Sequence, residues 1–184
     1  MDKPVDDSSA MSVDLKRFVQ ELYATTDEWY EVARLAERLC DHLNSPEAAR
    51  RIDVANQPGQ SSAAVQAAFG DFARELGFEN EKAGLFSAEE LSLRPDYFCR
   101  MGQTGVLLEV ERGKTTINNM DLLDFWKCHV CTHAQYLFLL VPKALRQNLT
   151  MSPRNEFLTV SRRLAKFFTP RTYTNVRGLC LFGY

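Results

Sequence analysis

Two apolar runs separated by a helix-forming stretch constrain the fold of this chain more than any other feature. Residues 104–111, TGVLLEVE, and residues 134–142, AQYLFLLVP, have the length and apolar content of β-strands, and the second is typical of a buried central strand. Residues 118–132 between them are predicted to be helical, with Asn118 as the cap. A strand–helix–strand unit implies a parallel pair joined by a right-handed crossover. The sequence therefore predicts an α/β domain.

Further elements are expected on both sides of this unit. Helices are predicted over residues 14–24, 27–43, 62–76 and 153–168, with a short one opened by Ser45 and Pro46. Extended segments are predicted over residues 83–87, 93–98 and 176–184. The predicted architecture is a mixed β-sheet flanked by helices. It divides into a disordered leader (1–13), an N-terminal helical extension (14–60) and an α/β core (61–184).

The helix predicted over residues 27–43 starts with Asp27 as its N-cap and carries a narrow apolar stripe with spacings of three and four residues: Trp29, Val32, Ala36, Leu39 and Leu43. We interpret the stripe as packing onto the rest of the domain. The alternative is a dimer contact, in which case the chain would be a structural interaction domain.

Length and composition exclude several classes. The 184 residues suit one domain, and no apolar run approaches the roughly 20 residues of a membrane span. The acidic start, MDKPVDDSSAMSVD, lacks the apolar stretch of a signal peptide. The five cysteines are odd in number and scattered among apolar residues, which favours a reducing, cytoplasmic location over a disulfide framework.

The net charge of -2 hides a division between the two halves of the chain. Residues 1–92 hold nine Lys or Arg and 18 Asp or Glu, a net charge of −9, whereas residues 93–184 hold 13 and six, a net charge of +7. This asymmetry indicates a polyanionic partner for the second half. The alternative is that the two halves simply pack against each other.

Three acids stand out in the basic half. Glu109 and Glu111 are two residues apart in a predicted strand, so they share one face, and Asp96 lies at the start of the preceding extended segment. Neighbouring carboxylates repel each other unless a cation lies between them. If the two strands are antiparallel neighbours, the three acids converge as hard oxygen ligands for an ion such as Mg²⁺. The alternative is a solvated face on which they pair with Arg94, Arg100 or Arg112.

Pro95-Asp96 and Glu109-x-Glu111, followed by a helix and an apolar strand, resemble the PD-(D/E)XK, or restriction-endonuclease-like, nuclease superfamily over residues 62–142. The core of that family runs helix, three strands, helix, strand. Its motif usually ends in lysine; here Glu111 takes that position, as in some small type II restriction enzymes. The resemblance implies that Asp96 and Glu109 are metal ligands, that Glu111 holds or deprotonates the attacking water, and that Mg²⁺ is the cofactor, with Mn²⁺ as a substitute.

A catalytic cation could come from elsewhere in the chain. Lys127 lies on an otherwise apolar helical stripe with Met120, Leu123 and Val130, from which it either passes the edge of the core or reaches the acids. Lys114 follows the strand in a turn, where it is solvated or contacts phosphate. An acid of the preceding helix, Asp71 or Glu75, could join the site, but a surface role is expected for both.

The segment KCHVCTH offers a competing metal site: Cys128, His129, Cys131 and His133. These residues lie within one short stretch at the end of a predicted helix, which cannot place four ligands tetrahedrally around one ion. We interpret Cys128 and Cys131 as small apolar helix residues.

The sequence as a whole predicts a Mg²⁺-dependent endonuclease that hydrolyses DNA phosphodiester bonds, related to restriction or phage defence. Cutting both strands of double-stranded DNA would need two sites, so a homodimer is expected. The DNA backbone would be bound by basic side chains: Arg112, Lys114, Arg154, Arg162, Arg163 and Lys166. The alternative, favoured by the missing motif lysine, is a catalytically inactive nuclease-fold module that binds nucleic acid or a protein partner.

Overall fold

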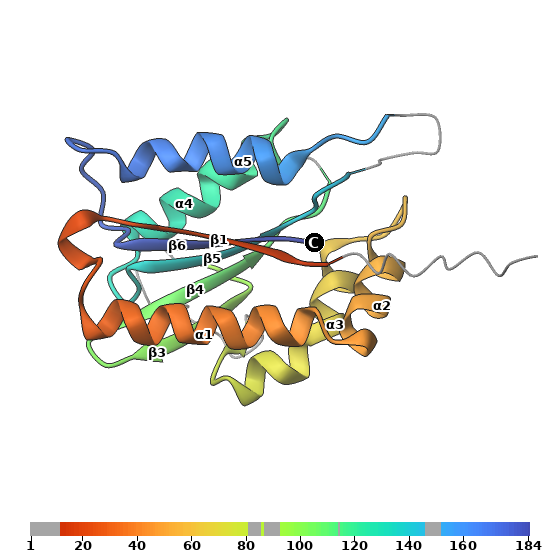
Figure 1. The fold of residues 1–184 in the computed structure, drawn as a ribbon, viewed down its shortest axis with the longest axis horizontal. Coiled ribbons are helices and arrows are strands. Elements are labelled where there is room, and N and C mark those ends of the chain that lie inside the picture. The colour runs from red at the N-terminus through yellow and green to blue at the C-terminus, as the bar shows by residue number, and fades with distance from the viewer. Residues whose placement is uncertain (1–11, 81–85, 87–92, 114, 146–151) are drawn as a thin grey trace, which may run out of the picture.

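The computed structural model describes residues 12–80, 86, 93–113, 115–145 and 152–184. Within these ranges the chain forms a mixed six-stranded sheet with helices on both faces (Figure 1). The predicted α/β class is therefore confirmed. The elements, in chain order, are β1 (Asp14–Val19), η1 (Glu21–Tyr23), α1 (Asp27–Leu43), α2 (Pro46–Ala55), α3 (Ser62–Glu75), β2 (Glu79–Asn80), β3 (Tyr97–Met101), β4 (Thr104–Val110), α4 (Met120–Val130), β5 (Tyr136–Val141), α5 (Glu156–Leu164), η3 (Ala165–Phe168) and β6 (Gly178–Gly183).

The strands are arranged in the order β1-β6-β5-β4-β3-β2. β4 pairs parallel with β5, and β5 pairs parallel with β6, whereas the outer pairs are antiparallel. The parallel pair predicted for residues 104–142 is thus confirmed. The order helix, three strands, helix, strand is also observed, as α3, β2, β3, β4, α4 and β5.

The two faces of the sheet bury separate apolar clusters. Val106, Leu108 and Val110 of β4 belong to the cluster covered by α1, α2 and α3. Leu107 points to the opposite side, where it packs with residues of α4 and α5. Figure 1 shows these two helical layers on either side of the sheet. Because side chains alternate along a strand, the residues that follow Leu107 at even spacing face α4.

Helix α1 has the predicted bounds, and its apolar stripe lies in the core, so packing within the domain is the correct interpretation of that stripe. The N-cap is Thr26 rather than Asp27, because the Thr26 hydroxyl accepts a hydrogen bond from the Trp29 N–H at 3.2 Å. The Ser45 cap and Pro46 start of α2 are as predicted.

The helix predicted over residues 14–24 is wrong. Residues 14–19 form β1, an edge strand antiparallel to β6, and a short 3-10 helix follows. Charged residues such as Lys16 and Arg17 are common on edge strands, and pairing with β6 outweighs a weak local preference for helix. The segment predicted to be a helical extension therefore supplies one strand of the sheet itself.

The remaining differences concern element ends. β3 begins at Tyr97, later than the extended segment predicted over residues 93–98, and α4 is capped at Asn119 rather than Asn118. The extended segment predicted over residues 83–87 lies outside the described residues apart from Phe86. Among the helices that the structure describes, none has the length and hydropathy needed to cross a membrane.

Candidate functional site

The antiparallel register of β3 and β4 brings Asp96 and Glu109 together. Tyr97 pairs with Leu108, so Asp96, at a bend one residue before β3, lies opposite Glu109. The Asp96 N–H donates to Glu109 Oε2 at 3.3 Å, and the Val110 N–H donates to Asp96 Oδ2 at 2.8 Å. Each carboxylate therefore accepts a hydrogen bond from a backbone N–H of the opposite segment, at the same end of the strand pair.

Glu111 extends the same face. Its N–H donates to the Leu140 carbonyl at 2.9 Å, so the strand pairing with β5 continues one residue beyond β4. The side chain follows Glu109 by two residues and is half-buried, whereas Glu109 is only 3% exposed. The three acids predicted to converge thus occupy one end of the β3–β4 pair.

Helix α4 supplies a cation to these acids. Lys127 Nζ lies 2.6 Å from Glu109 Oε1 and 3.1 Å from Asp124 Oδ1. Burial alone would lower the pKa of Lys127, but the Glu109 and Asp124 carboxylates outweigh it and raise that pKa above its ordinary value. Of the two fates considered for Lys127, the structure shows the one in which the lysine reaches the acids.

Asp124 is a fourth acid of the site, and the sequence interpretation missed it. It is 2% exposed and lies one helical turn before Lys127. Its Oδ1 accepts from Lys127, while its Oδ2 is buried and receives no hydrogen bond from the described residues. The Asp124 carboxyl faces that of Glu111, and two carboxyl groups hydrogen-bond only when one of them is protonated.

In the part of the chain that the structure describes, the acids at this strand end outnumber the cations. Burial, then the Asp124 carboxylate, raises the pKa of Glu109 well above its usual range and that of Glu111 to about 8. Burial likewise raises the pKa of Asp124, although Lys127 opposes the shift. Among the described residues, the Lys127 ammonium group alone cannot neutralise Glu109, Glu111 and Asp124, so these three acids are suited to taking up a proton or a further cation.

The donor chemistry fits Mg²⁺, although the acids do not form a closed cage. Within the ranges that the structure describes, no three His, Cys, Asp or Glu side chains are placed to hold one metal ion together. Mg²⁺ in enzymes is commonly held by one or two carboxylates, with water and substrate phosphate completing its shell. Carboxylate oxygens are the required ligand type, and Asp124 Oδ2 is a buried carboxylate oxygen that lacks a donor among the described residues.

The other candidates for the site lie elsewhere. Lys114 falls outside the described residues. Asp71 and Glu75 are exposed on α3, where Asp71 pairs with Arg74, so the surface role expected for them is observed. The stripe that carries Lys127 does not face the core as its apolar residues predict, since Leu123 and Val130 are exposed.

The predicted DNA-binding residues fall into two groups. Three of the arginines bond within the chain. Arg112 donates to the carbonyls of Gln57 and Gln60; Arg154 lies 3.5 Å from Glu156. Arg163 contacts Thr116, Asn119 and the buried Asp121. In contrast, Arg162 and Lys166 are exposed on the surface of α5 and η3.

Burial accentuates the basic character of the second half. All six acids of residues 93–184 belong to the described part of the chain, and each is buried or half-buried. The exposed charged side chains among the described residues of this half are consequently cationic: Arg94, Arg100, Arg162, Lys166 and Arg171. The surface of this half is more basic than its net charge suggests.

The cysteine–histidine segment does not form a metal centre among the described residues. Cys128 and Cys131 are buried, as expected for small apolar residues. The His129 ring is held by Thr174 and by the Asn175 N–H, at 3.1 and 3.0 Å from Nδ1, and the His133 ring stacks on Phe86.

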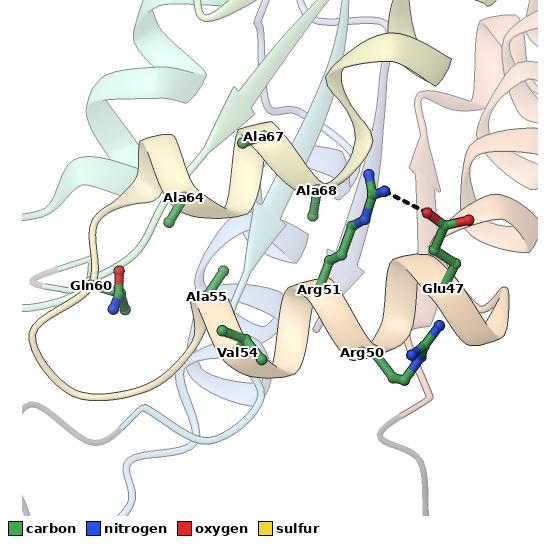
Figure 2. Close-up of a pocket in the computed structure, with 9 residues that line it drawn as sticks. All are labelled: Glu47, Arg50, Arg51, Val54, Ala55, Gln60, Ala64, Ala67 and Ala68. Atoms are coloured by element: carbon green, nitrogen blue, oxygen red, sulfur yellow. Dashed lines mark hydrogen bonds and ion pairs between the residues drawn. The ribbon is translucent and has the colours of Figure 1, made fainter.

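A pocket of about 600 Å³ lies between α2 and α3, away from the acidic cluster. Figure 2 shows that Ala55, Ala64, Ala67 and Ala68 line it and that Arg51 pairs with Glu47 at its rim. The four site acids are not among its lining residues. Its walls are mostly small apolar side chains, and the Glu47 carboxylate among its lining residues is paired with Arg51.

No family model and no curated sequence matches this chain. Among solved structures, the chain is similar to the restriction endonuclease BglII, crystallised in complex with a DNA 16-mer, with a TM-score of 0.47 and 10% sequence identity. The similarity covers 94% of this chain and 78% of the endonuclease chain.

Proposed function

We propose that this protein is a metal-dependent endonuclease that hydrolyses phosphodiester bonds in DNA. The observation that carries the proposal is the meeting of Asp96 and Glu109 across the β3–β4 pair, with the Lys127 ammonium 2.6 Å from Glu109. Acids at a strand end, joined by a lysine, are the groups that the nuclease resemblance requires. The order of elements around them is also the order expected for that family.

Each side chain has a defined task in this proposal. Asp96 and Glu109 would hold Mg²⁺, or Mn²⁺ in its place. When bound, the ion would polarise the scissile phosphate and favour ionisation of a nearby water. Glu111, half-buried at the end of the strand, would face the same ion and hold the attacking water against it.

Lys127 would contact the reacting phosphate. An ammonium group has three N–H donors, and Glu109 and Asp124 take two of them. The third remains for a phosphate oxygen, whose negative charge increases as water attacks. The lysine absent from the strand motif would thereby be replaced from α4.

The basic surface would hold the nucleic acid backbone. The exposed charged side chains of residues 93–184 are cationic, including the predicted contacts Arg162 and Lys166. Such contacts neutralise phosphates and give affinity that falls with salt. A homodimer would supply the second site needed to cut both strands of a duplex.

A plasmid-nicking assay tests the activity. Wild-type protein should convert supercoiled plasmid to nicked and linear forms in Mg²⁺ or Mn²⁺, and EDTA should stop the reaction. Glu109→Gln keeps the shape of the side chain but removes its charge, and should abolish cleavage. Asp71→Asn, at an exposed acid of α3, is the control and should cut like wild type.

Absence of cleavage of plasmid, single-stranded DNA and RNA in every divalent ion would refute the enzymatic proposal. A salt-sensitive gel shift in EDTA would then support the inactive nucleic-acid-binding module instead. A clean preparation in which Glu109→Gln still cuts would also contradict the site assignment.

A further inference from the structure

Asp124 is the site residue whose bonding is least complete. Its side chain is 3% exposed, and the Oδ2 atom has no hydrogen-bond donor in the described part of the chain. The neighbouring Oδ1 accepts from Lys127 at 3.1 Å, the longer of the two contacts that this lysine makes. A buried carboxylate oxygen without a donor is costly, so its retention needs an explanation.

The position of Asp124 points to a ligand rather than to packing. Its carboxyl lies beside the carboxyl of Glu111, at the open end of the strand, and Asp96 acts electrostatically on both. An ionised carboxylate only accepts hydrogen bonds, so Glu111 cannot satisfy Oδ2 in its charged form. Something positive is required between the two groups.

This step rests on the proposed function. We infer that Asp124 is a metal ligand of the site, and that Asp124 Oδ2 and the Glu111 carboxylate together hold a divalent cation. Two carboxylates are a sufficient protein contribution for Mg²⁺ or Mn²⁺, which complete their coordination with water and phosphate oxygens. Lys127 Nζ contacts the other carboxylate oxygen of Asp124, Oδ1, together with Glu109 Oε1, and so leaves Oδ2 for the ion.

Two simpler roles for Asp124 make different predictions. If Asp124 served only to position Lys127, its neutralisation would leave the affinity for a metal ion unchanged. If it shared a lasting proton with Glu111, the same result would follow. Only a ligand role makes the affinity for the ion, measured without substrate, depend directly on the Asp124 charge.

The test is a Mn²⁺ titration of the metal-free full chain, with free Mn²⁺ followed by its electron paramagnetic resonance signal. Asp124→Asn and Glu111→Gln should each weaken Mn²⁺ binding roughly tenfold or more, a loss typical of damaged metal sites. Asp121→Asn is the matched control: Asp121 is another buried acid of α4, one turn earlier, that pairs with Arg163 and does not contact Lys127. It removes the same charge and should change the affinity less than threefold.

Thermal melts in EDTA, run on every variant, restrict the comparison to folded protein, and Asp124→Glu serves as a second variant that retains the charge. The inference is overturned if Asp124→Asn binds Mn²⁺ within threefold of wild type, or if wild type binds no Mn²⁺. It is also overturned if Asp121→Asn weakens binding as much as Asp124→Asn, because the effect would then be one of net charge.

Plasmid cleavage separates this inference from the proposed function. Wild-type protein that binds Mn²⁺ through Asp124 but cuts no nucleic acid would support the ligand role and refute the nuclease. Wild-type protein that cuts in Mg²⁺, with Asp124→Asn retaining its affinity for Mn²⁺, would refute the ligand role and support the nuclease.

Discussion

Lys127 of α4 donates a hydrogen bond to Glu109 at the end of β4, with its Nζ 2.6 Å from Glu109 Oε1. In the nuclease motif that the sequence resembles, the lysine follows the acid by two residues on the strand. Here that position is Glu111, and the ammonium group reaches the same acid from the helix packed on that face. The chain thus has a lysine–glutamate pair at this strand end, although the strand itself carries no lysine there.

Lys127→Met should reduce DNA cleavage by at least roughly 100-fold, the scale of a lost general acid or charge-stabilising group. It should not weaken Mn²⁺ binding, because removing a cation leaves the carboxylates more negative. Lys143→Met is the control, since Lys143 pairs with Asp14 on β1 instead. Plasmid-nicking rates and Mn²⁺ titration check both parts, and full activity of Lys127→Met would leave the lysine a structural role alone.

The raised pKa of Glu111 should make the stability of the metal-free protein depend on pH. Burial and Asp124 raise its pKa to about 8 in the folded chain, compared with roughly 4.3 for a free glutamate. Between these values the folded state holds a proton that the unfolded state has lost. The stabilisation present at lower pH is therefore lost as the pH rises towards 8.

Urea denaturation in EDTA should accordingly show the free energy of unfolding falling between pH 6 and pH 8, and the Glu111 proton should contribute at most roughly 1.4 kcal/mol per pH unit to this fall. Glu111→Gln should flatten this slope, whereas Glu37→Gln, at an exposed acid of α1, should keep it. Parallel curves for wild type and Glu111→Gln would contradict the assignment of this proton to Glu111.

Arg162 and Arg163 are adjacent, but their replacement should have very different effects on the free energy of unfolding. Arg163 lies 3.4 Å from the wholly buried Asp121 and ties the segment before α4 to α5. Its replacement by alanine leaves a buried acid unpaired, so Arg163→Ala should lower the free energy of unfolding by about 3 kcal/mol. Arg162→Ala, at an exposed site, should cost less than about 0.5 kcal/mol.

Urea denaturation of the two variants measures this difference. Adding Asp121→Asn to Arg163→Ala should restore part of the lost stability, because the unpaired charge is removed. Equal stability of the two single variants would show that the contacts of Arg163 contribute little.

The period of two along β4 accounts for the part of the site that the sequence predicted. It places Glu109 and Glu111 on one face, and an antiparallel neighbour brings Asp96 opposite Glu109. The parallel pairing of β4 and β5 followed from two apolar runs and the helix between them. These features depend on local patterns that the sequence displays directly.

The face of α4 that is buried could not be predicted from such local patterns. Apolar residues are expected to face inward and acids outward, which favoured an inward face through Leu123 and Val130. In the structure Leu123 is 54% exposed, while Asp121 and Asp124 are buried. The helix can turn these acids inward because each has a cationic partner. Arg163 of α5 pairs with Asp121, and Lys127, one turn further along α4, pairs with Asp124. The spacing of three between Asp121 and Asp124 places both acids on one helix face, which the sequence displays. That this face is buried depends on contacts made only in the folded chain, such as the one between Asp121 and Arg163.

The salt dependence of DNA binding should distinguish exposed arginines and lysines from those that bond within the chain. Arg162 and Lys166 are exposed, so each is available to one phosphate. The double variant Arg162→Ala/Lys166→Ala should reduce the slope of log affinity against log salt by about 1 to 2, with similar losses for unrelated DNA sequences. Arg50→Ala, on α2 beside the alanine-lined pocket, is the control and should leave the slope unchanged. Fluorescence anisotropy in EDTA, over a series of salt concentrations, measures the slope without cleavage, and an unaltered slope in the double variant would place the DNA on another surface.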